Sequence, residues 1–421
     1  MGNGGNARYR SLRVRSAVLA AALSFVVAAY PRPSEALEIG PETDLCVALD
    51  NLQSGEELVL LPGDYRSGCA IRRGGFPGAP TVIRAADPSH RPRLLHPGRP
   101  VNMLEVRASD IVIRSLDFSP GLAEADGVRV IMGNRITVED CHFIQMGGIA
   151  VVANHTSVHG LTVRRNVISD SNSTGMYFGC HDGLGCTISG LRVEGNHIHG
   201  VTAPRPEIGY GIQVKLNSSG VIRDNMISDT KGPGIMVYGS RDLVATSVVE
   251  RNFTKGSRTS SGIVVGGGPA LVRNNISIAN FDSGIGLENY GRRGLLRRIV
   301  LAHNTVYGNQ GAGISVPDDG PLEALLINNA VHARPGARGV PATRAGLRLA
   351  GNVDCSLALC FANAHGLDFS PFPGSLLFGV AALQPGESSP VDDFFGRRRG
   401  MPPAIGAVEE ASGPVRPGIK E

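Results

Sequence analysis

The sequence predicts an all-β fold, a parallel β-helix whose short strands stack coil upon coil. An apolar-x-x-Asn step recurs every 23 to 30 residues, a spacing typical of solenoids that repeat one small structural unit per coil. A Gly-apolar-x-apolar step follows each Asn step and has the alternation of a half-buried strand. The 421 residues include 56 glycines and no tryptophan, which suits a chain with many turns.

Nine coils carry both marks. The first mark ends at Asn166, Asn196, Asn225, Asn252, Asn275, Asn304 and Asn329, with Leu116 and Cys141 at the same place in two earlier coils. The second mark reads GVRV, GIAV, GMYF, GIQV, GIMV, GIVV, GIGL, GISV and GLRL. Stacked at one bend, the Asn amides can bond one another from coil to coil. We therefore expect these asparagines to be internal and structural.

The N-terminus has the pattern of a secretory signal peptide. Four arginines lie between residues 8 and 15, an uncharged apolar run follows, and small residues stand at Ser34 and Ala36. This order of basic, apolar and small residues predicts a signal peptide over 1–36. The alternative is a membrane anchor, but the apolar run is shorter than the ~20 residues that a span needs.

The mature chain is predicted to be electrically neutral. Removing residues 1–36 takes away five arginines and one acid and leaves 36 basic and 36 acidic side chains. A neutral chain argues against a nucleic-acid partner, which usually requires a basic surface. We expect a secreted or periplasmic protein, monomeric, with no membrane span in its mature chain.

The seven cysteines fit an oxidising compartment. Six of them form three couples that are close in sequence, Cys46 with Cys69, Cys180 with Cys186, and Cys355 with Cys360. We predict these as disulfides. The seventh, Cys141, falls on a core position and is expected to be a buried, inert thiol.

The ends of the chain depart from the repeat. Residues 43–52 have an amphipathic helical period, and a capping helix there would cover the open end of the solenoid. Strands are expected in 56–66, 81–88 and 111–118. Residues 333–345 read as a loop and the chain beyond 350 as a last irregular coil. The expected domain is 37–411, with a disordered tail over 412–421.

Several segments carry a resemblance to a known group. LPGDY, the following TVIRA, the Asn-marked coils and the closing FFGRRRGMPPAIGAVE resemble the secreted bacterial right-handed parallel β-helix proteins of the pectate-lyase-like superfamily. The resemblance implies a right-handed parallel β-helix (solenoid) with an N-terminal capping helix. It also implies a polysaccharide as substrate or ligand, and it admits Ca²⁺ as a cofactor. The residues themselves identify no cofactor and no metal site.

The resemblance leaves the activity open. The superfamily includes polysaccharide lyases, uronate epimerases, glycoside hydrolases and non-catalytic NosD-like proteins, and a fold shared so widely does not fix function. The sequence lacks the DPHD stretch of alginate epimerases and the clustered aspartates of polygalacturonases.

Candidate site residues lie at the positions of the Gly-marked strands that should face water. One outward column reads Arg129, Ala150, Tyr177, Gln213, Met236, Val264, Gly286 and Ser315. The next reads Ile131, Val152, Gly179, Lys215, Tyr238, Gly266, Glu288 and Pro317. The longest insertions, 179–186 and 199–210, flank the coils on which polar and aromatic side chains gather. Together they predict a groove with cationic and aromatic walls.

Such a groove suits an acidic polysaccharide, because aromatic faces stack on sugars and cations pair with carboxylates. The leading hypothesis is a lyase acting by β-elimination. Lys215 or Tyr238 would be the base, the other or Arg241 would stabilise the charge that develops, and His181 is the reserve acid or base. The predicted substrate-binding residues are Tyr177, Gln213, Asn217, Arg241, Glu288, Tyr290 and Arg292.

Each of these residues also has an ordinary structural explanation. Tyrosines are frequent on sheets, Lys215 can be a solvated side chain, and Glu288 can balance nearby arginines. A non-catalytic carbohydrate-binding or envelope scaffold protein is therefore the main alternative. A glycoside hydrolase is less favoured because it needs two carboxyl groups over one cleft, and the columns supply only Glu288.

Overall fold

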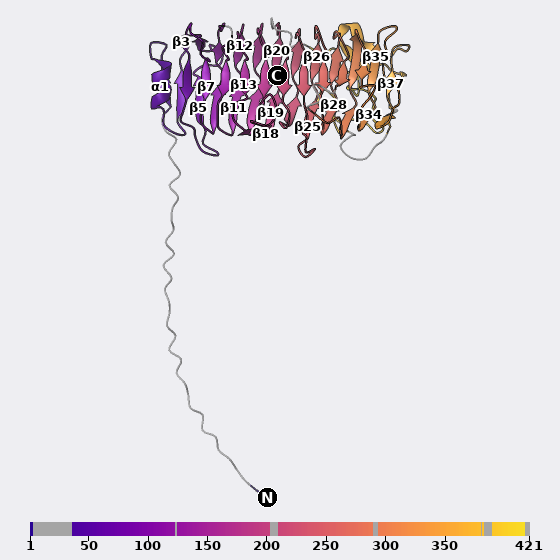
Figure 1. Cartoon of the computed structure of the whole chain (residues 1–421), viewed down its shortest axis with the longest axis horizontal. Coiled ribbons are helices and arrows are strands. Elements are labelled where there is room, and N and C mark those ends of the chain that lie inside the picture. Colours follow the sequence, from indigo (N-terminus) through magenta and orange to yellow (C-terminus); the bar gives the residue numbers. More distant parts are fainter. Residues whose placement is uncertain are drawn as a thin grey trace. The chain divides into compact units, whose positions relative to one another are not determined.

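The computed structural model describes residues 1–2, 36–122, 124–202, 209–288, 294–379, 381–382 and 390–416. Within the unit Glu35–Glu421, strands stack in sequence order along one axis and form three long parallel sheets (Figure 1). The predicted parallel β-solenoid is confirmed, with about twelve turns. The predicted signal peptide lies almost entirely outside the described residues.

A complete coil contributes one strand to each sheet, and the coils at the two ends are incomplete. The thirteen-stranded sheet has the order β1 (Leu37–Ile39), β2 (Glu57–Leu60), β5 (Thr81–Ala85), β8 (Ile111–Arg114), β11 (Ile136–Glu139), β15 (Leu161–Arg164), β19 (Leu191–Glu194), β22 (Gly220–Arg223), β25 (Ser247–Glu250), β28 (Ala270–Arg273), β31 (Ile299–Ala302), β34 (Ala324–Ile327) and β36 (Leu347–Ala350).

The twelve-stranded sheet contains the next strand of each coil, after one bend. It has the order β3 (Asp64–Arg66), β6 (Arg93–Leu95), β9 (Asp117–Phe118), β12 (His142–Ile144), β16 (Val167–Ser169), β20 (His197–His199), β23 (Met226–Ser228), β26 (Phe253–Lys255), β29 (Ile276–Ile278), β32 (Thr305–Asn309), β35 (Ala330–Ala333) and β37 (Val353–Asp354).

The ten-stranded sheet contains the Gly-marked strands. It has the order β4 (Cys69–Ile71), β7 (Leu104–Val106), β10 (Val128–Val130), β13 (Val151–Ala153), β17 (Met176–Phe178), β21 (Ile212–Val214), β24 (Ile235–Val237), β27 (Ile263–Val265), β30 (Ile285–Leu287) and β33 (Ile314–Ser315). Two small sheets pair β14 (Val158–His159) with β18 (Ile188–Ser189), and β38 (Phe361–Asn363) with β39 (Asp368–Pro371).

The predicted asparagine ladder is present and runs through the bend between the thirteen- and twelve-stranded sheets. Asn225 Nδ2 donates to Asn252 Oδ1 at 2.9 Å and to Val193 O at 2.9 Å. Its own Oδ1 accepts from the backbone N and the Nδ2 of Asn196. The same bonds continue in every coil from Asn166 to Asn329, and one further rung, Asn352, extends the ladder at its end.

The residue before each rung has a left-handed backbone, which turns the chain from one sheet into the next. Examples are Arg165 (φ 54), Asp224 (φ 58) and Arg251 (φ 54). Non-glycine residues rarely adopt this conformation, so each bend carries a local cost. The ladder bonds on the next residue help to offset that cost because they satisfy buried backbone and side-chain groups at the bend.

Close contact between neighbouring coils explains the glycine of the Gly-apolar-x-apolar step. A Cβ on Gly211 would lie 2.5 Å from Gly234 O and 2.7 Å from Ile227 Cγ2. Such distances are far inside van der Waals contact, so a side chain at Gly211 would push these two coils apart. Inside the coils, alternate side chains form one continuous apolar core.

Opposite charges alternate along the outer edge of the thirteen-stranded sheet. On seven successive strands the paired positions are Arg114, Glu139, Arg164, Glu194, Arg223, Glu250 and Arg273. Glu139 is almost fully buried and bonds both Arg114 and Arg164 at 2.5 Å. Burial alone would raise the pKa of Glu139, but the hydrogen bonds and charges of the two arginines lower it by more, so the pKa lies below its ordinary value. Like charges opposite one another would destabilise the sheet, so the alternation favours this register.

The predicted N-terminal helix is observed as α1 (Leu45–Asn51), with Asp44 Oδ1 accepting from the backbone N of Cys46 at 2.8 Å. Leu45 and Leu49 are buried in the core, and Cys46 is bonded to Cys69 of β4. Its role as an end cap stays a prediction. No helix in the described part of the chain is long and apolar enough to cross a membrane.

All three predicted disulfides are formed: Cys46–Cys69, Cys180–Cys186 and Cys355–Cys360. Cys141 is free and buried. Burial raises the pKa of its thiol to about 12, so the side chain stays protonated and unreactive at neutral pH.

The chain beyond residue 350 folds back across the outward face of the twelve-stranded sheet. We name residues 355–416 the C-terminal segment. Its buried side chains share an apolar cluster with Met226, Phe253 and Ile276, which face outward from β23, β26 and β29. Residues 412 to 416 remain attached, since Val415 N donates to Leu367 O; residues 417–421 are outside the described part.

Arg399 fastens this segment to the coils. Its guanidinium is buried and donates to Asn274 Oδ1 at 2.7 Å, to Glu409 Oε2 at 2.9 Å and to several backbone carbonyls. Next to it, His303 Nδ1 lies 3.1 Å from Ala404 O and its Nε2 lies 3.0 Å from Asn328 Nδ2. A carbonyl only accepts and the amide nitrogen only donates, so His303 is the neutral tautomer with its proton on Nδ1.

Replacing Asn225 with alanine should destabilise the protein without changing its fold. The variant leaves Val193 O and the backbone N of Asn196 buried without these partners, at a cost on the order of 1–3 kcal/mol. Thermal unfolding measures the effect. The matched control is Asn172→Ala, because Asn172 is exposed and outside the ladder. An Asn225→Ala midpoint equal to that of the control would mean that the ladder adds no stability.

His303 should make the protein sensitive to mild acid. Burial and the nearby Arg399 lower the pKa of His303 from 6.5 to about 3. The unfolded state therefore takes up this proton first, so stability is complete above pH 6.5 and falls between pH 6.5 and about 3. The slope contributed is up to about 1.4 kcal/mol per pH unit.

The measurement is denaturant unfolding at several pH values in that window, on wild type and His303→Asn. The variant should have a flatter profile, since its amide does not titrate and can still donate to Ala404 O. Two parallel profiles would show that His303 is not the group responsible.

Candidate functional site

The outward face of the ten-stranded sheet carries the predicted columns. The strand register pairs Arg129, Val152, Tyr177, Gln213, Met236, Val264, Gly286 and Ser315 in one row across successive strands. The prediction was wrong in one coil, where Ala150 was placed in this row. Ala150 is buried, and its carbonyl accepts from Val128 N just as Gly175 O accepts from Val151 N. The strand therefore begins one residue later, and Val152 takes the outward place.

Lys215, Tyr238, Tyr177 and Gln213 form one group, which we name the lysine–tyrosine cluster. Lys215 Nζ lies 4.2 Å from the centre of the Tyr238 ring and 5.3 Å from that of the Tyr177 ring. Gln213 Nε2 donates to Tyr238 Oη at 3.4 Å. An ammonium over aromatic faces is held by the negative charge of the ring faces, so the structure brings together four residues that the sequence placed on three strands.

This cluster is not an open groove, contrary to the prediction. Lys215 is 2% exposed, Tyr238 1% and Gln213 4%; Tyr177 is half-buried. The physical reason is a second apolar cluster on the outward face of the sheet, formed by Tyr210, Leu216, Met236, Tyr238 and Val264. Outward-pointing residues of a sheet are solvated only where nothing packs over them.

Gly179 makes room for this arrangement. Its φ is 96, and a Cβ there would lie 2.3 Å from Ser218 Oγ and 3.1 Å from Lys215 Cβ. In the sequence Gly179 stands in the same column as Lys215 and one strand before it. A side chain at that position would push Lys215 away from Tyr177.

Asn217 has a structural role at the edge of the site. It has a left-handed backbone (φ 61), its Nδ2 donates to Gly183 O, and its Oδ1 accepts from Arg241 N, each at 3.0 Å. It therefore joins the loop 180–186 to the loop that follows β24. Arg241 and His181 are both exposed.

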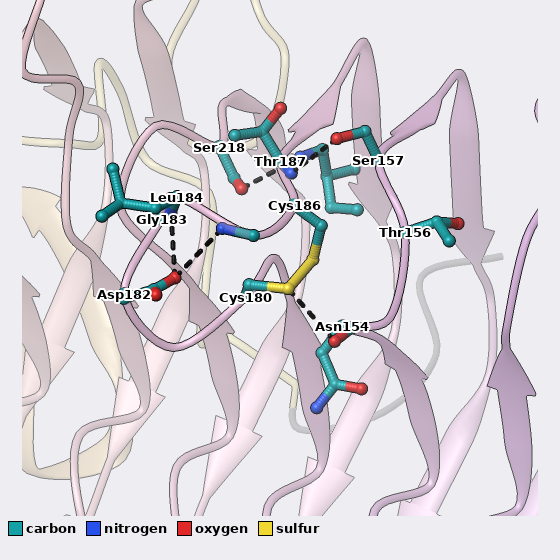
Figure 2. Close-up of a disulfide and its surroundings, with 12 residues drawn as sticks. Asn154, Thr156, Ser157, Cys180, Asp182, Gly183, Leu184, Cys186, Thr187 and Ser218 are labelled. Carbon is teal, nitrogen blue, oxygen red and sulfur yellow. Dashed lines mark hydrogen bonds between the residues drawn. A yellow bond between two sulfur atoms is a disulfide. The ribbon is translucent and has the colours of Figure 1, made fainter.

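The loop that holds His181 is closed by the disulfide Cys180–Cys186 and rests on neighbouring coils (Figure 2). Within it, Asp182 Oδ1 accepts from the backbone N of Leu184 and Gly185, and these bonds lower the pKa of Asp182. Ser157 and Ser218 accept backbone N–H groups from 187–188. The loop is thus anchored on both sides.

A pair of carboxylates lies further along the same face. Ser261 Oγ is 3.4 Å from both Asp282 Oδ2 and Glu288 Oε1, so the two carboxylate oxygens lie within twice that distance of each other. Glu288 folds back over Gly286, where a Cβ would lie 2.8 Å from Glu288 Oε1. Burial and the charge of Asp282 raise the pKa of Glu288.

The sequence analysis included Glu288 but missed Asp282. Asp282 precedes its strand and is not at an outward strand position, so the column pattern could not find it. Gly286 was the available signal, because a glycine in an outward column leaves space for neighbouring side chains. Tyr290 and Arg292, also predicted, lie outside the described residues. Among those described, no three His, Cys, Asp or Glu side chains gather as a metal site would require.

Comparison with known proteins identifies the family. A model of the right handed beta helix region matches residues 126–252 and 182–354, together more than half of the chain. No curated protein matches in sequence. Among solved structures, the Dettilon tailspike protein (gp208) has a TM-score of 0.53 at 13% identity, covering 76% of this chain and 67% of its own.

Two further solved structures have lower scores. Pectate lyase Pel9A has a TM-score of 0.46 at 15% identity, with 89% of this chain and 96% of that chain covered. The periplasmic alginate epimerase AlgG has 0.49 at 14% identity, with 75% and 83% covered. Similarity at these identities concerns the fold alone. On the match of the family model, the chain belongs to the right-handed β-helix family.

Proposed function

We propose that this protein is a secreted or periplasmic enzyme that cleaves an acidic, uronate-containing polysaccharide by β-elimination. The observation that carries the proposal is the lysine–tyrosine cluster, in which a cation and a phenol are held together on the outward face of the ten-stranded sheet. Three disulfides support a location outside the cytoplasm, because such bonds persist in oxidising compartments. We expect the enzyme to act as a monomer.

The chemistry of the cluster fits the reaction. In β-elimination a base removes the proton α to the uronate carboxylate, the C4–O bond breaks, and the leaving oxygen takes up a proton. A double bond remains in the product. The Lys215 ammonium can pair with the carboxylate and stabilise the charge that develops there. Tyr238, as a phenolate beside that ammonium, would take the α proton and pass it to the leaving oxygen.

Pre-organisation is the contribution of the surrounding residues. Gln213 Nε2 contacts the Tyr238 hydroxyl at 3.4 Å and Gly179 leaves space for Lys215, so the two reacting groups already lie side by side before the substrate arrives. Tyr177 is the half-exposed member, and its ring offers a stacking face for a sugar. For a uronate carboxylate to reach Lys215 Nζ, the side chains that bury the lysine must move on binding.

A second candidate is acid–base hydrolysis by the carboxylate pair. The observation that favours it is the raised pKa of Glu288 next to Asp282, since glycoside hydrolases set one protonated and one ionised carboxyl group against the same bond. Glu288 would donate a proton to the leaving oxygen. The Asp282 carboxylate would either attack the anomeric carbon, forming an intermediate that water then hydrolyses, or take a proton from an attacking water. Asp282 is exposed, so this pair is more accessible than the lysine–tyrosine cluster.

The test uses purified mature protein with polygalacturonate and alginate, measuring both ultraviolet absorbance of the new double bond and the release of reducing ends. Tyr238→Phe and Lys215→Met should each lower turnover by about two to four orders of magnitude. Methionine is chosen at position 215 because it keeps the volume of the buried lysine side chain, whereas alanine would open a cavity. Thermal unfolding of each variant confirms that it is folded.

Glu288→Gln is the matched comparison on the same face. Elimination predicts that Glu288→Gln still forms the double bond at near wild-type rates. If reducing ends appear without a double bond, and if this activity is lost in Glu288→Gln and kept in Tyr238→Phe, the reaction is hydrolysis and not elimination. Binding without cleavage, lost in Lys215→Met, would mean a carbohydrate-binding protein in place of an enzyme.

A further inference from the structure

Exposed apolar side chains gather at the end of the solenoid opposite α1, where β36 and β37 are the last strands of their sheets (Figure 1). Two of them stand on the loop closed by Cys355–Cys360, and three follow β39 in the chain. The two groups are joined, because Phe372 N donates to Cys360 O at 2.9 Å. We name these side chains the apolar end patch: Leu357, Leu359, Phe372, Leu376 and Phe378.

The leucines of this patch project from a loop of restricted shape. Leu357 is 101% exposed and Leu359 is 66% exposed, although a disulfide closes the loop and Ser356 Oγ accepts from Ala333 N at 3.0 Å. Apolar patches on the surface of a folded protein usually mark a place that contacts a partner or a membrane. A leucine whose whole side chain projects from a loop tip suits a fluid apolar phase, because no shaped pocket is needed to receive it.

Unpaired arginines lie beside the leucines. Arg334 follows Ala333 and Leu357 follows Ser356, so the bond between Ala333 and Ser356 sets these two positions next to each other. Arg338 follows after one tight turn. Both arginines are exposed, and neither forms an ion pair within the described part of the chain. Guanidinium groups bind phosphates through paired hydrogen bonds, so this turn favours an anionic partner.

The last strands themselves are not suited to pair with a second copy of the chain. Arg348 of β36 and Asp354 of β37 are exposed and charged, and Asp354 Oδ1 accepts from the backbone N of Ser356 at 2.9 Å. Charged side chains on edge strands oppose pairing with another sheet. The apolar end patch therefore calls for an occupant other than an end-to-end neighbour.

We propose that the apolar end patch docks on the surface of an anionic lipid bilayer. Leu357 and Leu359 enter the boundary between headgroups and acyl chains, and Arg334 and Arg338 bind the lipid phosphates. Such docking draws on buried apolar area and on electrostatic attraction together. This inference goes beyond the proposed polysaccharide chemistry, because the patch and its arginines share no residue with the lysine–tyrosine cluster.

The experiment is co-sedimentation of the full mature chain with large unilamellar vesicles. One set contains phosphatidylcholine alone, and the other contains an equal mixture of phosphatidylcholine and phosphatidylglycerol. The chain should sediment with the mixed vesicles, more weakly with the neutral ones, and less as salt is added, because salt screens the arginines. Analytical ultracentrifugation without vesicles records whether the chain associates with itself.

Two double variants separate the two contributions. Leu357→Ser combined with Leu359→Ser should lower the partition coefficient by at least about 10-fold. Arg334→Gln combined with Arg338→Gln should lower it on mixed vesicles by about 5-fold for each arginine removed and leave it unchanged on neutral vesicles. All four side chains are exposed, so the thermal unfolding midpoint should stay at the wild-type value.

Leu184→Ser is the matched control for the leucines, because Leu184 is exposed on another disulfide-closed loop. Arg258→Gln, at an exposed arginine of a middle coil, is the control for charge, and both should bind like wild type. The inference is overturned if the wild type binds neither kind of vesicle, if the double leucine variant loses no more binding than Leu184→Ser, or if neutral vesicles bind as strongly as mixed ones. Self-association that the double leucine variant abolishes, without vesicle binding, would assign the patch to a second copy of the chain.

Discussion

Hydrogen bonds between stacked asparagines hold one bend of every coil in place, and the other layers depend on the spacing they set. Each rung bonds the backbone of one coil and the side chain of the next, so the coils cannot slide past one another without breaking buried bonds. That fixed register brings the close glycine contacts into line. It also places Arg114, Glu139 and Arg164 opposite one another, which stabilises the outer surface.

The same spacing brings side chains that are distant in the sequence together on the ten-stranded sheet. Residues at one outward position recur in adjacent strands, so Lys215 and Tyr238, 23 residues apart in the sequence, become neighbours. The face is uneven, however. Apolar packing around Met236 and Val264 encloses the lysine–tyrosine cluster, whereas the Gly286 position leaves an open place in which Asp282 and Glu288 approach each other. Two kinds of reactive environment therefore share one surface.

The sequence predicted those features that repeat. The ladder from Asn166 to Asn329, the outward rows and the disulfides follow from local marks and from spacing, and all three are present. What could not be predicted depends on contacts between distant segments. The burial of Lys215 requires packing from outside its own strand. Asp282 approaches Glu288 from a turn and not from an outward strand position. Ala150 occupies the place that the marker glycine has in other coils. The C-terminal segment has no period at all, so nothing in it indicated where it would pack.

The return path of that segment changes how the solenoid can unfold. In a simple solenoid each coil contacts only its neighbours, and the ends can fray independently. Here Arg399 reaches Asn274, Thr305 Oγ1 accepts from Ala407 N, and Asp392 pairs with Arg251, so one stretch near the C-terminus bridges three successive coils. The later coils gain this support only once the C-terminal segment has packed, so their stability depends on a segment that follows all of them in the sequence.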